Sequence, residues 1–487
     1  MTRLFTINDI PAQAFIDNKW VSGTGAQLCL KNPKDGSDIP IKLHSVSVTD
    51  IDHAVVISKK AFSTGPWSKM TGSQRGRCLN RLADLIEEYS DEIFYFESLA
   101  SGRPISASKR EISMVAGVFR YYAGWADKIK GDTFPPDDGF YKFVTQEPLG
   151  VCAGVTAWNG SLHFLAWKAA PALACGNTSI IKPSEKSPLG TLAFGYLIEA
   201  AGFPPGVFQI LPGDPAAGAA IASHMKIDKI SFTGSTSTGR KIQEASAKSN
   251  LKRVTLELGG KSPSIVFDDA DIETAIFWSI IGITSNSGQV CAASSRIYIQ
   301  DTIIDKFLER LKVAFQHVNN ALGGDPQDET TTFGPLVDQS QYDKVRSYIE
   351  AGKQTAELIV GGDEYEGKGT YVAPTIFLNP ESDASVYTEE VFGPVLCARS
   401  FHTEEEALEL ANDTSFGLAG SVFTKDLGRA MRVSRAIQAG TVSVNCALMV
   451  GPQAPMGGMK LSGVGRELGE YALRHYTEPK TIWIRAE

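Results

Sequence analysis

Residues 229–240 read Lys-Ile-Ser-Phe-Thr-Gly-Ser-Thr-Ser-Thr-Gly-Arg, in which a short apolar run leads through a glycine into a polar stretch. The pattern predicts a buried strand at Lys229–Phe232 and a helix at Thr238–Ala247. Glycines at 234 and 239 let the backbone approach a pyrophosphate at the helix N-terminus, where free N–H groups and the helix dipole favour anions. The spacing is Gly-x4-Gly rather than Gly-x-Gly-x-x-Gly, and a plain strand–helix turn explains it at least as well.

The same alternation of short apolar runs and helical stretches continues on both sides of this segment. The predicted strands are Gly150–Ala157, Thr178–Ile181, Val207–Leu211 and Val254–Glu257. The predicted helices are Leu165–Leu173, Leu189–Ala201 and Ala216–Ser223. Alternation at this density indicates βαβ units around a parallel sheet with right-handed crossovers.

A second alternating region extends from about residue 262 to residue 444. Its predicted elements are Ile265–Phe267, Asp271–Ser285, Ile304–Val318, Gln341–Ala351, Val395–Ala398 and Glu404–Asn412. The first 130 residues are mainly helical in pattern, at Ile51–Ser63, Arg75–Glu97 and Ile112–Trp125. Tyr141–Thr145 and the tail Tyr476–Ile484 alternate like edge strands that would suit a contact between subunits.

Length and composition limit the class of protein. A chain of 487 residues is longer than a domain with a single hydrophobic core, so two or three domains are expected. A net charge of -8 without a long Lys/Arg run argues against nucleic acid and membrane partners. No long apolar run and no signal or transit pattern is found, which predicts a cytoplasmic protein. The seven cysteines form no Cys-x-x-Cys pair and the seven histidines have no ligand spacing, so no metal is expected.

Three segments contain residues that could bind a nucleotide or take part in catalysis. Glu185, in Lys-Pro-Ser-Glu at a strand end, could accept hydrogen bonds from a ribose diol, although a solvated loop explains it as well. Glu257 lies between two leucines, where burial would raise its pKa towards that of a general base; the alternative is a paired core carboxylate. Cys291 is surrounded by small residues that leave room for a substrate, but a buried, inert cysteine has the same pattern.

The order of several motifs is more specific than any one of them. The chain contains Ala157-Trp-Asn159, Lys182-Pro-Ser-Glu185, Gly234-Ser-Thr-Ser-Thr-Gly239, Glu257-Leu-Gly-Gly, Gln289-Val-Cys291, Glu389-Glu-Val-Phe-Gly-Pro394 and Pro455-Met-Gly-Gly-Met-Lys-Leu-Ser-Gly. Together they resemble the aldehyde dehydrogenase superfamily, in its NAD(P)-dependent, non-acylating branch. The resemblance extends from about Phe15 to Ile484.

The resemblance implies a role for each catalytic candidate. Cys291 would attack the aldehyde carbonyl to give a hemithioacetal and then a thioester. The side-chain amide of Asn159 and the backbone N–H of Cys291 would form the oxyanion hole. Glu257 would activate the water that hydrolyses the thioester.

The resemblance also implies an α/β fold with two Rossmann-like, parallel-sheet domains and a small bridging β-segment. The nucleotide-binding domain would comprise residues 1–130 and 150–258, and the catalytic domain residues 259–450. The bridging segment would comprise residues 131–149 and 470–487, so homodimers or homotetramers are expected. A small aldehyde is the implied partner.

NAD is the implied cofactor, with NADP possible because Lys182 and Lys186 flank Glu185. The residues placed at the cofactor are Thr156, Trp158, Lys182, Ser184, Glu185, Gly218, Gly234, Ser235, Gly239, Gln341, Lys344, Glu390 and Phe392.

Gly160, Val450 and Met456 stand where many family members carry aromatic residues, so the substrate tunnel should be wide. The pocket prediction comprises Gly160, Phe164, Trp167, Val290, Ala292, Val450 and Met456. Phe164 and Trp167 could equally pack a helix onto the sheet. The hypothesis is a bulky, apolar or aromatic aldehyde.

Three other functions are considered. An acylating dehydrogenase would pass the thioester to coenzyme A, but such enzymes generally lack the base at the position of Glu257. A catalytically silent binding protein would have lost Cys291, Glu257 or Asn159, all of which are present. A simple cysteine hydrolase would need none of the nucleotide motifs.

Overall fold

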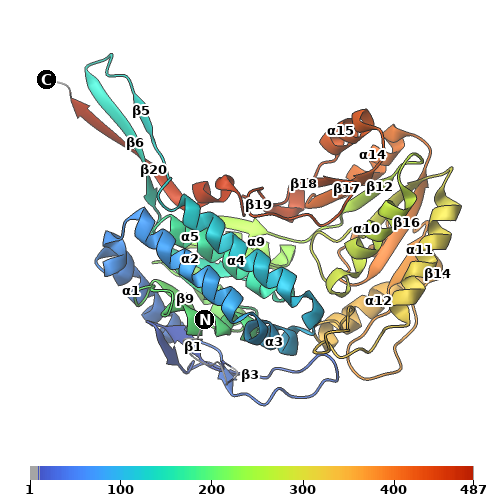
Figure 1. Cartoon of the computed structure of the whole chain (residues 1–487), viewed down its shortest axis with the longest axis horizontal. Helices are drawn as coiled ribbons and strands as arrows, with labels where there is room; N and C mark the ends of the chain where they lie inside the picture. Colours follow the sequence, from blue (N-terminus) through green and yellow to red (C-terminus); the bar gives the residue numbers. More distant parts are fainter. Residues whose placement is uncertain (1–8, 10, 486–487) are drawn as a thin grey trace.

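Two α/β lobes and a projecting arm make up the molecule (Figure 1). The computed structural model describes residue 9 and residues 11–485. Each lobe is built around one large, mostly parallel sheet, which confirms the predicted fold class. Among the described helices, none is long and apolar enough to cross a membrane.

The first sheet has eight strands in the order β19-β11-β10-β7-β8-β9-β1-β2. The five strands from β11 to β9 are parallel, and β19, β1 and β2 add antiparallel edges. The strands are β1 (Ala14–Ile16), β2 (Lys19–Val21), β7 (Val151–Val155), β8 (Thr178–Lys182), β9 (Phe208–Ile210), β10 (Lys229–Thr233), β11 (Arg253–Glu257) and β19 (Gly463–Val464). A small separate pair consists of β3 (Gln27–Leu28) and β4 (Leu43–His44).

Helices of the first lobe cover this sheet. They are α1 (Val48–Ser63), α2 (Gly72–Glu88), α3 (Ser90–Ser101), α4 (Ser108–Trp125), α5 (Ser161–Ala174), α6 (Leu189–Ala193), α7 (Gly195–Ile198), α8 (Pro215–Ser223) and α9 (Thr236–Lys248). In Figure 1, α2, α4 and α5 form a layer of roughly aligned helices. One large apolar cluster joins this layer to the sheet.

Two predicted helices are divided in the structure. The single helix expected over Arg75–Glu97 is broken at Tyr89, whose φ of -108° and ψ of 23° end α2 and start α3. Asp91 and Glu92 occupy the first turn of α3, where acidic side chains favour a new helix start. The helix expected over Leu189–Ala201 is interrupted at Phe194, between α6 and α7.

The second sheet has seven strands in the order β14-β15-β16-β13-β12-β17-β18. They are β12 (Pro263–Val266), β13 (Arg296–Gln300), β14 (Glu357–Val360), β15 (Thr375–Leu378), β16 (Val395–Phe401), β17 (Ala419–Phe423) and β18 (Thr441–Val444). The helices are α10 (Ile272–Thr284), α11 (Ile304–Asn319), α12 (Gln339–Thr355), α13 (Ser385–Thr388), α14 (Glu404–Asn412) and α15 (Leu427–Ala436).

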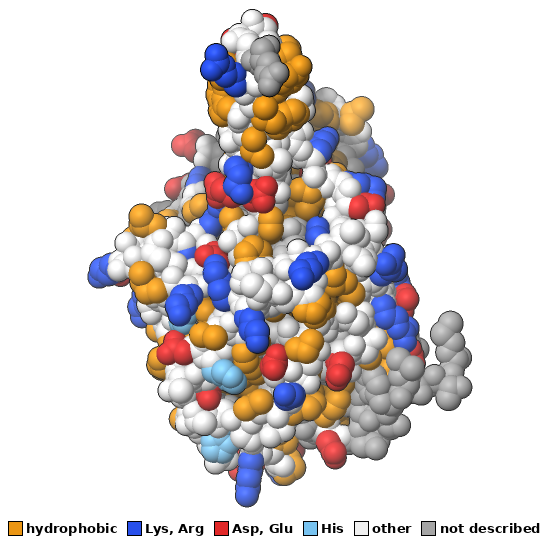
Figure 2. Space-filling model, turned by 90° about the vertical axis from the view of Figure 1, so that its left-hand side faces the viewer, with side chains coloured by type: hydrophobic (Ala, Val, Ile, Leu, Met, Phe, Trp, Pro, Cys, Tyr) orange, Lys and Arg blue, Asp and Glu red, His pale blue; other side chains and the backbone are white. Residues whose placement is uncertain are grey.

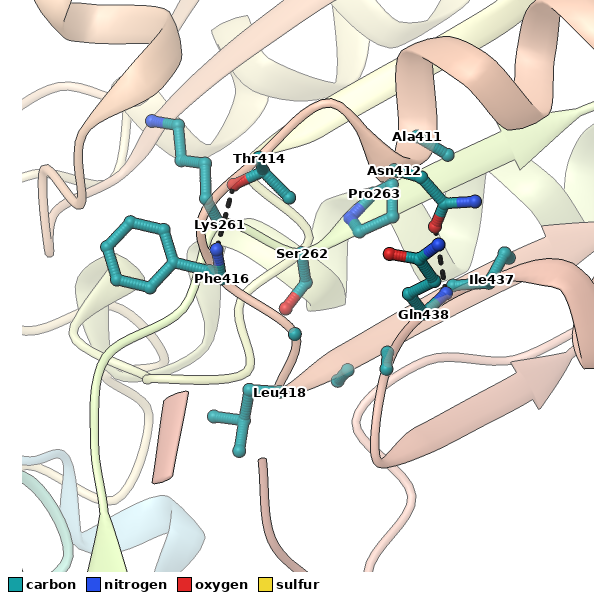
Figure 3. A pocket seen from close by; sticks show the side chains of 13 residues that line it. Lys261, Ser262, Pro263, Ala411, Asn412, Thr414, Phe416, Leu418, Ile437 and Gln438 are labelled. Atoms are coloured by element: carbon teal, nitrogen blue, oxygen red, sulfur yellow. Dashed lines mark hydrogen bonds between the residues drawn. The ribbon is translucent and has the colours of Figure 1, made fainter. Parts of the chain in front are cut away.

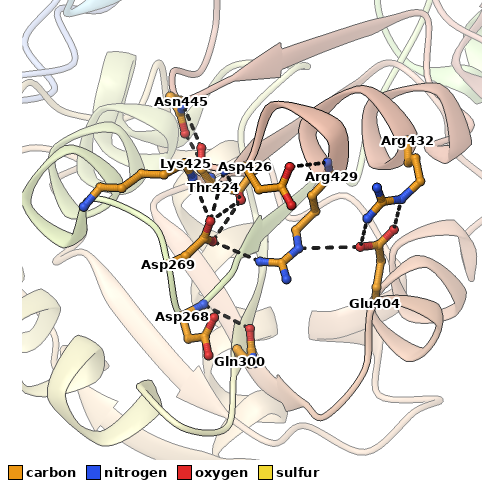
Figure 4. Close-up of polar contacts among 10 residues, drawn as sticks. All are labelled: Asp268, Asp269, Gln300, Glu404, Thr424, Lys425, Asp426, Arg429, Arg432 and Asn445. Atoms are coloured by element: carbon orange, nitrogen blue, oxygen red, sulfur yellow. Dashed lines mark hydrogen bonds and ion pairs between the residues drawn. The ribbon is translucent and has the colours of Figure 1, made fainter.

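Asp269 ties the ends of neighbouring strands in this second sheet together (Figure 4). It follows β12 and accepts hydrogen bonds from Thr424 Oγ1 at 2.8 Å and from Arg429 Nη1 at 3.0 Å. The backbone N–H of Asp426, which caps α15, donates to the same carboxylate at 3.0 Å. One carboxylate therefore fixes α15 against the ends of β12 and β17.

The arm is a three-stranded antiparallel sheet that projects from the first lobe (Figure 1). It consists of β5 (Asp132–Phe134), β6 (Phe140–Pro148) and β20 (Thr477–Arg485). The register of β20 on β6 runs from Thr477 opposite Pro148 to Arg485 opposite Phe140. The two edge segments predicted from the sequence thus pair with each other.

Candidate active site

Candidate residues gather where the parallel strands of the first sheet end. Thr156 follows β7, Lys182 ends β8, Gly234 follows β10 and Glu257 ends β11. These strands are neighbours in the sheet, so their carboxyl ends form one edge. In open α/β sheets, ligands bind beyond this edge.

A charged pair at the end of β8 marks one side of this edge. Lys182 is buried, and its Nζ lies 3.6 Å from Glu185 Oε2. Gly218 of α8 lies beside it, since a Cβ there would be 3.7 Å from Lys182 Cε. Ser184 lies in the same turn, and its hydroxyl oxygen accepts a hydrogen bond from the N–H of Lys186 at 3.3 Å.

In the glycine-containing turn, Ser235 caps a helix and Gly239 allows that helix to pack closely on a strand. Ser235 is exposed and caps α9, where its Oγ accepts from the N–H of Thr238 at 3.3 Å. Gly239 instead faces the sheet, because a Cβ there would lie 2.6 Å from Leu258 Cδ2. Gly239 therefore serves close packing of helix on strand, while Gly234 and Ser235 lie at the helix N-terminus that suits an anion.

An aromatic pair connects the two lobes. The rings of Trp158 and Phe392 meet edge to face, with centroids 5.2 Å apart. Gln341 of α12 donates from Nε2 to the carbonyl oxygen of Phe392 at 2.9 Å. Lys344 donates to the carbonyl oxygen of Glu390 at 3.5 Å, and Glu390 accepts from the N–H of Gly260 at 2.9 Å. The structure thus brings these predicted residues from both lobes together.

The turn before Cys291 has an unusual backbone. Asn286 (φ 48°), Ser287 (φ 56°) and Gly288 (φ 73°) are all left-handed, which is a strained arrangement for the two residues with side chains. Asn286 Nδ2 donates to the carbonyl oxygen of Asn159 at 3.1 Å. Asn159 Nδ2 donates to the carbonyl oxygen of Gln289 at 3.0 Å and has a second N–H available. The candidate amide is therefore held directly against the cysteine turn.

A cavity lies between the cysteine turn and the segment that carries Glu390. Its lining comprises Gly260, Ile283, Gly288, Val290, Ala293, Ser295, Glu390, Val391, Phe392 and Gly393. A second cavity lies elsewhere in the same lobe, around Lys261, Ser262, Asn412, Phe416 and Gln438 (Figure 3). None of the predicted site residues lines this second cavity, so it is not part of the site.

The surroundings of Cys291 favour the protonated form of its thiol. Burial raises the pKa of the Cys291 thiol to about 12, and the carboxylates of Glu390 and Glu257 add to the rise. Cys291 follows an irregular turn rather than starting a helix. The thiol is therefore protonated at neutral pH in this state.

The reactivity of Cys291 towards iodoacetamide should report this environment. Only the thiolate reacts, so the alkylation rate should rise about tenfold per pH unit between pH 7 and pH 9. Glu390→Gln removes a neighbouring negative charge, which lowers the pKa and should speed alkylation about 3- to 10-fold at pH 8. Glu389→Gln is the matched control, because Glu389 accepts from Tyr348 Oη instead. Alkylation that is independent of pH, or equal rates in the two variants, contradicts this description.

Glu257 belongs to a buried charged group that the sequence did not reveal. Burial, followed by the carboxylate of Glu467, raises the pKa of Glu257 well above its usual range. Lys168 Nζ lies 2.6 Å from Glu467 Oε1 and also donates to Thr233 Oγ1 at 2.6 Å. Glu257 Oε1 and Glu467 Oε2 have no hydrogen-bond partner among the residues that the structure describes. The lone lysine in the apolar helix Leu165–Leu173 was the available signal for this group.

The predicted substrate residues belong largely to one continuous apolar cluster. Its members include Phe164, Trp167, Val290, Ala292, Val450 and Met456. The rings of Phe164 and Trp167 meet edge to face at 5.4 Å. Phe164 also lies against Gly160, since a Cβ there would be 3.2 Å from Phe164 Cε2. The Phe164 ring therefore takes up part of the space that a glycine at position 160 leaves.

The strand-end edge suits a dinucleotide. Lys182 and Glu185 provide a buried cation and a carboxylate for a ribose, and α9 presents its N-terminus to a phosphate. The unpartnered hydroxyl of Thr156 lies at the same edge. Within residues 9 and 11–485, no group of three His, Cys, Asp or Glu side chains could hold a metal ion.

Comparison with known proteins gives a consistent result. Residues 20–482 match the aldehyde dehydrogenase family. Retinal dehydrogenase 2 of Homo sapiens is 46% identical over 476 residues, which cover 97% of this chain and 91% of the relative. An aldehyde dehydrogenase of Davidiella tassiana is 46% identical over 98% of this chain and 95% of its own length. The solved NAD+ complex of a Bacillus cereus aldehyde dehydrogenase is 40% identical, with a TM-score of 0.94 over 98% of this chain and 97% of that chain. The chain belongs to the aldehyde dehydrogenase family.

Proposed function

We propose that Cys291, Asn159 and Glu257 carry out the oxidation of an aldehyde to its carboxylic acid by this chain. One observation carries the assignment of these residues. The Asn159 amide is hydrogen-bonded to the turn that leads into Cys291, and the buried Glu257 raises the pKa of the Cys291 thiol. A nucleophile, an oxyanion donor and a base thus occupy one site.

The chemistry follows from these three groups. The Cys291 thiol first gives up its proton to water; its sulfur then bonds to the aldehyde carbon, and the carbonyl oxygen becomes an oxyanion. Asn159 Nδ2 and the Cys291 N–H donate to that oxygen. NAD(P)+, when bound, would accept the hydride of that carbon; the oxyanion then re-forms the carbonyl, which leaves a thioester on Cys291. Glu257 then takes a proton from the water that adds to the thioester, and the carboxylic acid leaves as the carbon–sulfur bond breaks.

The proposed cofactor site follows the edge of the first sheet. Lys182 and Glu185 hold the adenosine ribose, with Thr156, Ser184 and Gly218 beside them. Gly234 and Ser235 hold the pyrophosphate at the start of α9. The nicotinamide ribose is held by the set Trp158, Gln341, Lys344, Glu390 and Phe392. Glu185 favours NAD, because its carboxylate would repel a 2′-phosphate. The NAD+ bound to the Bacillus cereus relative supports this proposal.

Hydrolysis, rather than transfer to coenzyme A, is the proposed fate of the thioester. Glu257 supports it, because an acylating enzyme needs no base for water. A silent binding protein is disfavoured by the presence of all three catalytic candidates. A cysteine hydrolase is disfavoured because it has no use for the charged pair of Lys182 and Glu185.

The proposed substrate is a bulky, apolar or aromatic aldehyde. The apolar cluster next to Cys291 supports this class, with Gly160, Phe164, Trp167, Val290, Ala292, Val450 and Met456 as its proposed lining. The human relative is named for retinal, which is a long apolar aldehyde. Phe164 and Trp167 are the side chains expected to contact the substrate.

The substrate proposal is tested with a panel of aldehydes and both nucleotides. Aromatic and long-chain aldehydes should exceed acetaldehyde in kcat/KM by about tenfold or more, because each buried methylene adds about 0.8 kcal/mol. NAD should exceed NADP, and Glu185→Gln should narrow that difference. A steep preference for acetaldehyde contradicts the bulky-substrate proposal, while the nucleotide comparison tests Glu185 independently.

The domain boundaries, assembly and location are proposed on separate grounds. The two sheets support a nucleotide-binding domain (residues 1–130 and 150–258) and a catalytic domain (residues 259–450). The bridging segment (residues 131–149 and 470–487) is proposed to assemble a homodimer or homotetramer, because the arm within it exposes apolar side chains (Figure 2). These are Phe134, Phe140, Tyr141, Ile482, Trp483 and Ile484. All seven cysteines are free, which suits the reducing cytoplasm.

A further inference from the structure

A chain of hydroxyl groups connects a buried carboxyl group to the backbone beside Asn159. Ser161 Oγ lies 2.6 Å from Glu97 Oε1 and 3.1 Å from Ser187 Oγ, and a longer contact of 3.5 Å joins it to the carbonyl oxygen of Trp158. Ser187 Oγ in turn lies 3.0 Å from the carbonyl oxygen of Trp158. Glu97, Ser161 and Ser187 are all 0% exposed, so water cannot replace these contacts. Three consecutive contacts thus lead from α3 to the peptide bond between Trp158 and Asn159.

The number of protons available to this series of hydrogen bonds depends on whether Glu97 is ionised. Each of the three contacts needs one proton, and the two serine hydroxyls supply only two. With Glu97 ionised, Ser161 donates to it, and Ser187 can serve either Ser161 or the carbonyl of Trp158, but not both. With Glu97 protonated, Glu97 donates to Ser161, Ser161 to Ser187, and Ser187 to the carbonyl. Only the protonated form satisfies these three shorter contacts together.

The surroundings favour that protonated form. Burial raises the pKa of Glu97 to about 7 against the opposing effects of Arg103 and of the hydrogen bond from Ser161, and the carboxylate of Glu111 adds to the rise. The guanidinium of Arg103 is paired with Glu111. His163 of α5 lies near the same pair, and burial lowers its pKa to about 4, so it is neutral. α6, which packs along α3, contributes no ionisable side chain.

The segment at the end of this chain carries the proposed oxyanion donor. Trp158–Gly160 form a single turn of 3-10 helix, named here the oxyanion loop. Asn286 Nδ2 holds the loop at the carbonyl oxygen of Asn159, on the side of the cysteine turn. Ser187 holds it at the preceding carbonyl oxygen, on the side of α3. The two attachments fix consecutive peptide groups on either side of the Asn159 Cα.

We propose that Glu97, in its protonated form, is a positioning residue that holds the oxyanion loop through Ser161 and Ser187. This rests on the proposed function, because the loop matters only if Asn159 stabilises an oxyanion. Loss of an oxyanion donor costs about 100- to 1000-fold in rate, and a misplaced donor loses part of that. The effect therefore falls on kcat rather than on substrate binding.

A series of variants separates this role from general stability. Glu97→Gln stays neutral, and its Nε2 can donate to Ser161, so it should retain most of the wild-type kcat at pH 6.5. Ser161→Ala, Ser187→Ala and Glu97→Ala break the chain and should lower kcat about tenfold, with KM changed less than about threefold. Ser98→Ala is the matched control, because Ser98 is buried on the same helix and its hydroxyl has no partner.

The pH dependence gives the second readout. The ratio of wild-type kcat to Glu97→Gln kcat should fall as the pH rises through about 7, because only the wild type loses the proton. Ionisations elsewhere are common to both proteins and cancel in this ratio. The proposal is overturned if Glu97→Gln is as slow as Glu97→Ala at pH 6.5, if Ser161→Ala and Ser187→Ala behave like Ser98→Ala, or if the ratio is constant. Failure of the proposed function would appear instead as turnover that survives Cys291→Ala.

Discussion

Cys291→Ala is expected to lower the rate of aldehyde oxidation by more than about four orders of magnitude. Removal of a covalent nucleophile costs rate on this scale, because the remaining groups can only bind and polarise the substrate. The substitution removes one sulfur atom at a half-buried position, so the fold should be kept. Turnover is measured by the absorbance of the reduced nicotinamide.

The control for this variant is Cys29→Ala. Cys29 is exposed and free, so its loss should leave the activity unchanged. Nucleotide binding by Cys291→Ala, measured by calorimetry, should stay within about threefold of the wild type, because the proposed cofactor contacts lie elsewhere. Residual turnover above about 1% would contradict the covalent role of Cys291.

Glu257→Gln is expected to lower steady-state turnover by about 100- to 10,000-fold, the range for loss of a general base. The first half of the reaction does not need this base for water, so one reduced nucleotide per active site should still appear as a rapid burst. In the wild type, the raised pKa of Glu257 means that deacylation should rise with pH until the carboxyl group ionises. The variant should lack that rise.

Added coenzyme A distinguishes hydrolysis of the thioester from its transfer to coenzyme A. If the natural acceptor is water, added coenzyme A should leave the wild-type rate and its carboxylic acid product unchanged. If steady-state turnover is unaffected by Glu257→Gln, the residue is not the base. Coenzyme A thioester formation by the wild type would favour an acylating enzyme.

Much of the fold follows from the spacing of apolar residues. Alternating runs from Gly150 to Glu257 predicted the parallel strands, because strands buried on both faces are continuous apolar segments. The short β1 and β2 were missed, since three-residue strands carry too little pattern. The break at Tyr89 was missed because apolar spacing continues across it, although the acidic pair that follows marks a helix start.

The candidate site was predictable only in part. The motif order identified Cys291, Asn159 and Glu257, but it gave no information on the charges around them. The raised pKa of the Cys291 thiol could not be predicted, because it depends on burial and on Glu390 and Glu257, which distant segments place near it. For the same reason, the ion pair of Lys168 and Glu467 could not be predicted, because the two residues are 299 positions apart and meet only in the folded chain.

Mass spectrometry of acid-quenched Glu257→Gln tests the covalent mechanism most directly. After mixing with NAD+ and an aromatic aldehyde, the protein should gain the mass of the aldehyde less two hydrogens, because an acyl group replaces the thiol proton. Digestion should locate that mass on the peptide containing Cys291, and the double variant with Cys291→Ala should lack it. A burst of reduced nucleotide without any adduct, or an adduct on another residue, would contradict a thioester at Cys291.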